Sequence, residues 1–149
     1  MTTNDTFTVT RPVPLEIIRG LLCCAFEGGS NYWYGDLDID SYPTGIDKKD
    51  DRLEFWHTSI PTYPGGKISF IDIEEMPGEE GSGHEYVEGW GRVERRDLRH
   101  TLTLERLILG AQALAEKFPR HWANALSQND DAYTGDAYLQ CCVFGDVIY

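Results

Sequence analysis

The sequence contains no run of about 18 uncharged apolar residues, the length that a membrane-spanning helix needs. Its opening residues include Asn4, Asp5 and Arg11, and they lack the apolar segment of a signal peptide. We therefore expect a cytoplasmic protein with no membrane partner. The sequence also lacks internal repeats, low-complexity tracts and a recognisable linker, so its 149 residues are expected to form a single domain, 1–149.

Positive charge is scarce, because 13 Lys and Arg residues oppose 25 Asp and Glu residues and leave a net charge of −12. Proteins that bind a nucleic-acid backbone need clustered Lys and Arg, so direct nucleic-acid binding is not expected. Acids are concentrated in Asp36–Glu54 and in Asp72–Glu88, and the second segment contains no base. Such a surface either favours solubility or faces a basic partner.

Familiar catalytic and metal-binding motifs are missing. The cysteines form two adjacent pairs, Cys23-Cys24 and Cys141-Cys142, instead of the C-x-x-C spacing of zinc sites. We expect buried, reduced thiols, because free cysteine packs as a small hydrophobic residue. No H-E-x-x-H, P-loop or G-x-G-x-x-G pattern occurs. We therefore predict no catalytic residue, no metal site and no cofactor. A hydrolase that uses an unfamiliar pair of carboxylates as acid and base remains a third functional alternative.

Alternating apolar and polar residues predict strands in several segments. The predicted strands are Thr6–Thr10, Trp33–Ile39, Arg52–Ser59, Lys67–Glu75 and Glu85–Arg96. Two prolines and two glycines between the third and fourth of these predict a hairpin. The last three strands would form an antiparallel meander, and Val9 would lie on a fourth strand.

Apolar residues at spacings of three and four predict the helices. The predicted helices are Leu15–Phe26, Leu102–Phe118, Pro119–Gln128 and Gly135–Phe144. Gly28 is expected to end the first in a left-handed conformation, Thr101 or Thr103 to cap the second, and Thr134 to cap the last before Gly145. The pattern predicts an α+β fold, an antiparallel three- to four-stranded sheet with helices packed on one face.

The segment "EGGSNYWYGD" (27–36) joins the first helix to a strand, and "NDDAYTGDAYLQ" (129–140) opens the last helix. Glycines let the backbone approach a ligand, aromatic rings stack on a flat ring, and amides, carboxylates and arginines bind base, ribose and phosphate. Such a set suits a nucleotide-like small molecule. The candidate ligand-binding residues are Ser30, Asn31, Tyr32, Trp33, Arg99, Arg120, Asp131, Thr134 and Asp136.

The same residues also fit a purely structural interpretation. In that interpretation Gly28 caps the helix, Asn31 closes a turn, and Trp33 packs under the sheet. Local composition leaves both interpretations open.

The stretches "AFEGGSNYWY", "KFPRHWANAL" and "NDDAYTGDAYLQCCVFGDVIY" resemble a family of small, mostly uncharacterised proteins of bacteriophages and prophages. The resemblance covers about half of the chain and carries no known activity. It implies a phage accessory protein that acts in the host bacterial cytoplasm, with counter-defence as one role of that class.

Two functional hypotheses follow. The first is a non-enzymatic protein that binds a nucleotide-like ligand through the "GGSNYWY" loop. The alternative is an acidic, nucleic-acid-mimicking inhibitor that binds a basic host protein through the loops 36–51 and 72–88. The C-terminal "VFGDVIY" is further a candidate for burial in a homodimer interface.

Overall fold

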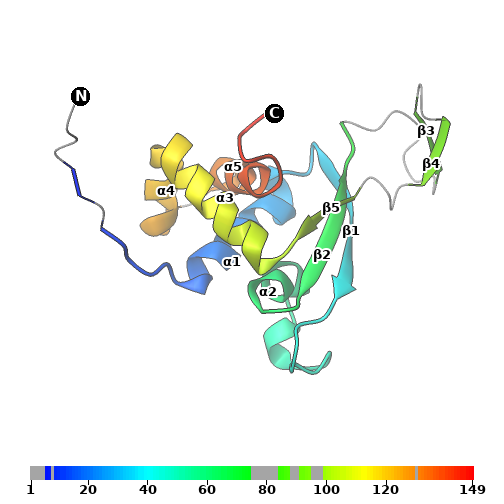
Figure 1. Cartoon of the computed structure of the whole chain (residues 1–149), viewed down its shortest axis with the longest axis horizontal. Coiled ribbons are helices and arrows are strands. Elements are labelled where there is room, and N and C mark those ends of the chain that lie inside the picture. Colours follow the sequence, from blue (N-terminus) through cyan, green and yellow to red (C-terminus); the bar gives the residue numbers. More distant parts are fainter. Residues whose placement is uncertain (1–5, 8, 75–83, 88–90, 95–98, 130) are drawn as a thin grey trace.

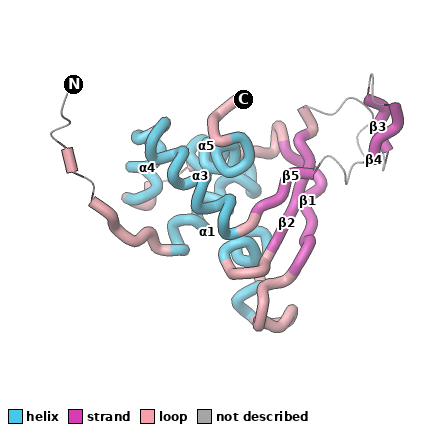
Figure 2. The backbone as a smooth tube through the Cα atoms, in the orientation of Figure 1, coloured by secondary structure: helices cyan, strands magenta, loops and turns pink. Residues whose placement is uncertain are grey.

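The computed structural model describes residues 6–7, 9–74, 84–87, 91–94, 99–129 and 131–149. The helices are α1 (Leu15–Cys24), α2 (Trp56–Ser59), α3 (Leu104–Lys117), α4 (Pro119–Leu126) and α5 (Ala132–Phe144), with the helical turns η1 (Ala25–Gly29), η2 (Asp51–Leu53) and η3 (Ile60–Thr62). The strands are β1 (Tyr34–Ser41), β2 (Lys67–Asp72), β3 (His84–Val87), β4 (Gly91–Glu94) and β5 (Arg99–Leu102). The predicted α+β class is confirmed: helices pack against one face of a three-stranded antiparallel sheet (Figures 1 and 2).

The sheet has the strand order β1-β2-β5, so β2 is central and the other two strands are edges. Tyr34 pairs with Asp72 across β1 and β2, and Phe70 pairs with His100 across β2 and β5. The register of β1 shifts between Gly35 and Asp38, as in a β-bulge. β3 and β4 pair only with each other in a separate antiparallel ladder.

The core lies between the sheet and the helices. On the inner face of β2, the ring of the fully buried Phe70 meets the edges of Phe26, Trp33 and Tyr34 at centroid distances of 6.0, 5.7 and 5.9 Å. The helices contribute mainly branched side chains and one tyrosine, Tyr138. Tyr138 is fully buried, and its hydroxyl donates to the carbonyl oxygen of Leu107 at 2.8 Å, so its polar atom has a partner inside the core.

Several predicted boundaries are confirmed. α3 begins after Thr103, whose Oγ1 accepts the backbone N–H of Arg106 at 3.4 Å. α4 begins at Pro119, where the missing N–H costs nothing in the first helical turn. α5 ends at Gly145, which has a left-handed φ of 72°.

Two predicted strands are wrong. The described residues of Thr6–Thr10 form no strand, and Val9 is 74% exposed instead of lying on a fourth strand. Arg52–Ser59 forms η2 and α2, because the carboxylate of Asp50 accepts the backbone N–H of Arg52 and starts a helical turn there. The predicted hairpin is therefore absent, and Lys67–Asp72 pairs with β1 and β5 instead.

The segment Glu85–Arg96 was predicted as one strand, whereas its described residues contribute to two strands, β3 and β4. Residues 88–90 and 95–96 of this prediction lie outside the described residues. β5 was missed, because it has only four residues and the last of them, Leu102, was assigned to the helix predicted at Leu102–Phe118.

Three smaller predictions also need correction. Gly28 does not adopt the left-handed conformation; its φ is 160°, inside the π-type turn η1 that prolongs α1. α5 is capped by Asp131 rather than Thr134, since the carboxylate of Asp131 accepts the N–H of Thr134 at 2.9 Å. The cysteines were all expected to be buried, whereas Cys23 is exposed and Cys24 is half-buried; Cys141 and Cys142 are buried as predicted. Among the described residues, no helix has the length and apolar character needed to cross a membrane.

Candidate functional site

The two loops that the sequence singled out do meet, at the carboxylate of Asp136 in α5. Oδ1 of Asp136 accepts hydrogen bonds from Ser30 Oγ at 2.8 Å and from Trp33 Nε1 at 2.7 Å. Oδ2 accepts bonds from Tyr32 Oη at 2.6 Å and from Gln140 Nε2 at 3.1 Å. We call these five residues the Asp136 cluster. Its donors are satisfied by one carboxylate within the chain, which is the arrangement expected of a structural clasp.

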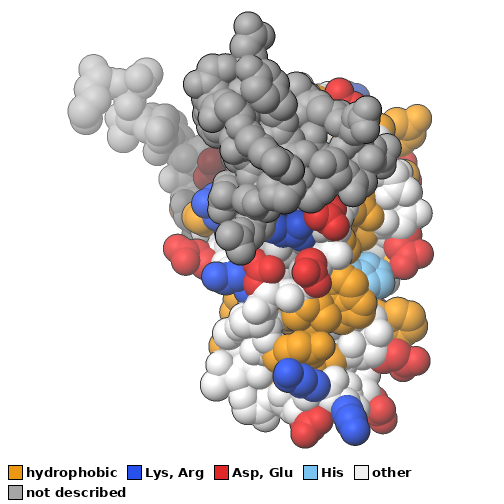
Figure 3. All heavy atoms as spheres, turned by 90° about the vertical axis from the view of Figure 1, so that its right-hand side faces the viewer, with side chains coloured by type: hydrophobic (Ala, Val, Ile, Leu, Met, Phe, Trp, Pro, Cys, Tyr) orange, Lys and Arg blue, Asp and Glu red, His pale blue; other side chains and the backbone are white. Residues whose placement is uncertain are grey.

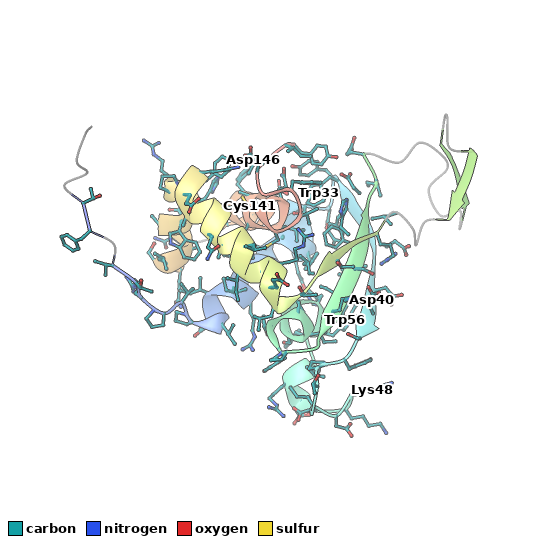
Figure 4. All side chains as sticks on the ribbon, viewed as in Figure 1. Trp33, Asp40, Lys48, Trp56, Cys141 and Asp146 are labelled. Carbon is teal, nitrogen blue, oxygen red and sulfur yellow. The ribbon has the colours of Figure 1, made fainter. Side chains whose placement is uncertain are left out.

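The prediction that Trp33 stacks on a ligand is not supported, because the side chain of Trp33 is fully buried. The indole lies between α5 and the sheet (Figure 4), where it contacts Phe70, Phe144 and Tyr149 at centroid distances of 5.7, 5.5 and 5.7 Å. Both ring faces are therefore occupied by core packing. This is the structural interpretation that the sequence left open.

Tyr32 is the exposed member of the cluster, with 48% of its surface accessible. Burial raises the pKa of Tyr32 to about 12, and the hydrogen bond to the Asp136 carboxylate adds to this increase, since ionising the phenol would place two negative charges together. The phenol therefore holds its proton and stays a donor to Asp136 through the neutral pH range.

Close backbone contacts hold the two segments of the cluster together. A Cβ atom on Gly29 would lie 2.3 Å from the carbonyl oxygen of Ala132, and one on Gly135 would lie 2.5 Å from Cβ of Cys24. Both distances are far below van der Waals contact. The glycines therefore let α5 approach the end of α1 and η1, which is a packing role rather than a ligand contact.

The C-terminal segment packs against the cluster of its own chain. The side-chain oxygen of the fully buried Gln140 accepts the backbone N–H groups of Ile148 and Tyr149 at 2.8 and 2.9 Å. The hydroxyl of Tyr149 donates to the carboxylate of Asp72 at 2.5 Å, and Asp72 is only 1% exposed. The segment "VFGDVIY" thus contacts its own chain, while Ile148 and Tyr149 stay 52% and 40% exposed, so its burial in a homodimer interface remains a prediction.

The remaining predicted site residues are spread over several elements, and none of them lies in the Asp136 cluster. Asn31 and Arg120 are exposed, on the loop after η1 and on α4. Arg99 lies on β5, where its guanidinium pairs with Asp36 at 3.0 Å. Asp131 and Thr134 act at the start of α5, and the cap lowers the pKa of the Asp131 carboxyl.

One polar contact beside the cap was not predicted from the sequence. Nδ1 of His121, on α4, lies 3.0 Å from Oγ1 of Thr134. A histidine beside a hydroxyl resembles part of a nucleophilic site, but Thr134 is fully buried and its hydroxyl is out of reach of a substrate. The contact instead ties α4 to α5. Within the described residues, no group of three or more His, Cys, Asp or Glu is arranged to hold a metal ion.

An apolar groove lies elsewhere, between the segment before α1, α1 itself, α3 and α4, and sequence analysis missed it as a site. Its volume is about 420 Å³. The lining residues are Arg11, Val13, Leu15, Ile18, Leu104, Leu107, Ile108, Ala111, Gln112, Ala115 and Trp122. None of the nine predicted ligand-binding residues is among them. The sequence did contain one indication of the groove. The apolar stripe of α3 includes Ile108, whose side chain is 52% exposed and lines the groove instead of the core.

Among the described residues, few of the seven acids in the first acidic segment form ion pairs. Asp50 forms a salt bridge with Arg52 at 2.9 Å, and Asp36 pairs with Arg99 of β5 at 3.0 Å. On the face drawn in Figure 3, acidic side chains alternate with Lys and Arg. Most of the second acidic segment, 72–88, lies outside the described residues.

No protein-family model matches the chain, and no curated protein and no solved structure is significantly similar to it.

Proposed function

We propose that this chain is a non-enzymatic binding protein whose ligand occupies the apolar groove between α1, α3 and α4. The observation that carries the proposal is the groove itself, with its volume of about 420 Å³ and its predominantly apolar lining. Ligand sites typically measure roughly 300–1,000 Å³ and combine apolar walls with a few polar groups. Arg11 and Gln112 are the polar groups here.

The lining indicates the chemical class of the ligand. Each methylene removed from water contributes about 0.8 kcal/mol, so an apolar chain or ring system gains most from these walls. The guanidinium of Arg11 and the amide of Gln112 favour a ligand with one acidic or hydrogen-bonding end. A highly charged nucleotide suits the groove less well.

The surface of α3 supports the same proposal. Ile108 is 52% exposed and lines the groove, while its neighbour Leu109 is 50% exposed and does not. A ligand in the groove would cover the apolar surface of Ile108. The pair also offers a matched control, because the same substitution at the two positions changes charge and hydrophobicity equally.

The biological setting rests on the resemblance to phage and prophage proteins. In that setting, the chain acts in the cytoplasm of a bacterial host and captures an apolar metabolite or an apolar segment of a host protein. The nucleotide-binding hypothesis has less support, since the Asp136 carboxylate already accepts the hydrogen bonds of Ser30, Tyr32 and Trp33.

Binding of decanoate and decanol, followed by calorimetry and by the intrinsic tryptophan fluorescence to which Trp122 of the groove contributes, tests the proposal. We expect saturable binding of both probes to the unmodified protein. Ile108→Glu should weaken decanoate binding at least about tenfold, which corresponds to about 1.4 kcal/mol. Leu109→Glu should leave it unchanged, and Arg11→Ala should weaken decanoate binding but not decanol binding.

Two results would contradict the proposal. One is the absence of saturable binding of either probe to the unmodified protein. The other is an equal loss of affinity in Ile108→Glu and Leu109→Glu, because binding would then depend on total charge instead of the groove.

A further inference from the structure

The N-terminal arm, residues 6–14, leads away from the start of α1 (Figure 1) and carries exposed apolar side chains. Among its described residues, Phe7 is 87% exposed and Val9 is 74% exposed, and they form no strand. The segment "TFTVT" alternates apolar and polar residues, which is the pattern of a segment that is covered on one side. The described part of a single copy does not supply that cover.

The sequence of the arm opposes folding back onto its own copy. Pro12 and Pro14 fix their own φ at about −65° and restrict the residue before each of them to extended conformations. Pro14 has φ −60° and ψ 138°, which is extended. Residues 8–10 are all β-branched and belong to types that disfavour a tight turn. Phe7 is therefore better placed to reach a second copy than the surface of its own.

The apolar groove is the surface that matches the arm. It begins at the base of the arm, because Arg11 and Val13 are among its lining residues. Leu15 and Ile108, which also line it, are 40% and 52% exposed, so the walls are not fully covered within one copy. None of the lining residues is an acid, and residues 6–14 contain no acid either. In a chain with a net charge of −12, the two surfaces can therefore meet without burying a carboxylate.

We infer that the arm of a second copy docks in this groove, so that two copies exchange arms in a symmetric homodimer. Phe7 and Val9 are the side chains that the groove covers. Because the base of each arm lines the groove of its own copy, an incoming arm passes beside the base of the other arm. The reciprocal contact is then identical, as two-fold symmetry requires. The inference rests on the groove of the proposed function, and the arm and an apolar ligand compete for the same walls.

The test is sedimentation equilibrium of the unmodified chain and of variants. We expect a concentration-dependent dimer of the unmodified chain. Phe7→Glu should raise the dimer dissociation constant at least about tenfold, because it places a charge in an apolar groove. Phe55→Glu is the matched control, since Phe55 is 65% exposed and lies outside the arm and the groove, and it should leave the constant unchanged. Circular dichroism checks that each variant is folded.

Mixing two variants separates arm exchange from other modes of dimerisation. Phe7→Glu keeps an intact groove, and Ile108→Glu keeps an intact arm. At a concentration at which the unmodified chain is dimeric, neither variant should dimerise alone. An equal mixture should form heterodimers, because one intact arm can then enter one intact groove.

Four results would overturn the inference. The first is an unmodified chain that stays monomeric, whether its groove is then empty or holds its own arm. The others are an equal weakening of the dimer by Phe7→Glu and Phe55→Glu, a dimer of Ile108→Glu as tight as that of the unmodified chain, and a mixture that stays monomeric.

Decanoate separates this inference from the proposed function. A monomeric chain that binds decanoate in the groove would exclude arm exchange and leave the proposed function intact. An arm-dependent dimer of a chain that does not bind decanoate would do the reverse. Where both hold, saturating decanoate should dissociate the dimer of the unmodified chain, and a dimer that persists with decanoate in the groove would overturn the inference.

Discussion

The indole Nε1 of Trp33 donates a 2.7 Å hydrogen bond to Oδ1 of Asp136, which lies 103 residues further along the chain. The loop after η1 and the helix α5, which are far apart in the sequence, are thereby tied together at one carboxylate. Trp33 is fully buried, so an indole N–H without this partner would be left unsatisfied in the core. The aromatic motif after α1 consequently serves to clasp α5 to the sheet.

Asp136→Ala should destabilise the protein strongly. It removes the acceptor of two fully buried donors, Ser30 Oγ and Trp33 Nε1, and each unsatisfied donor costs about 1–3 kcal/mol. We expect a loss of about 3 kcal/mol in the free energy of unfolding, and a melting temperature lower by about 10 °C. Urea and thermal unfolding measure both quantities.

Asp38→Ala is the matched control for that substitution. The Asp38 carboxylate is exposed and accepts a bond from the neighbouring N–H of Ile39 at 2.8 Å. Its removal should change stability by less than about 1 kcal/mol. Equal stability of the two variants would mean that the Asp136 cluster does not hold the fold together.

The stability of the folded protein should fall at high pH partly through Tyr32. Burial, together with the hydrogen bond to Asp136, raises the pKa of Tyr32 from 10.0 to about 12 in the folded protein. The contribution of Tyr32 to the free energy of unfolding is therefore complete below pH 10 and is lost as the pH rises toward 12. Tyr32→Phe should therefore flatten the decline of the urea midpoint over that interval. Tyr133→Phe, at a tyrosine that is 80% exposed, should leave the decline intact, and an identical decline in all three proteins would refute the assignment.

Gly135→Ala should push α5 away from α1. The added Cβ would lie 2.5 Å from Cβ of Cys24 and 2.8 Å from the carbonyl oxygen of Leu21, and overpacking of this kind costs about 3 kcal/mol. Gly35→Ala is the comparison, since its Cβ would meet only Cγ2 of Ile73, at 3.1 Å. Chemical unfolding of both variants is the measurement. Similar stabilities would show that the close helix approach is not required.

Tyr149→Phe should loosen the C-terminal segment. It removes the donor of the 2.5 Å bond to the buried carboxylate of Asp72, and a bond to a charged group contributes about 1.5–3 kcal/mol. Ile148→Ala, at a side chain that is 52% exposed, should have a smaller effect. Hydrogen exchange of the amides of residues 148 and 149 reports the loosening directly. Unchanged protection of both amides in Tyr149→Phe would contradict the role of Asp72.

Long periodic segments were predictable from the sequence, and short ones were not. The stripe of α3 extends over 14 residues, so the helix followed from the sequence alone, while the choice between Thr101 and Thr103 as its cap was settled by the structure. β5 has four residues, too few for a period to emerge beside a strong helix signal. The alternation in Arg52–Ser59 was overridden by the Asp50 cap, a local hydrogen bond that the alternating pattern does not reveal.

The candidate sites show the same limit. Tyr32, Trp33 and Asp136 were singled out by residue type, and the structure does bring them together, but the sequence could not show that they bind one another. The groove depends on how Val13 and Trp122 are placed beside α3, which only tertiary packing decides. Residue type alone therefore located a clasp and missed the groove.

The most direct measurement is a map of ¹⁵N–¹H amide shifts in the unmodified protein during titration with decanoate. If decanoate binds in the groove, we expect saturable shifts at Ile18 and at residues 104–115, which border it. The amide resonances of the Asp136 cluster should not shift. Shifts confined to residues 30–34 and 132–140, or no saturable shift at all, would contradict this expectation. The first of those results would return the aromatic motif to the role of a ligand-binding loop.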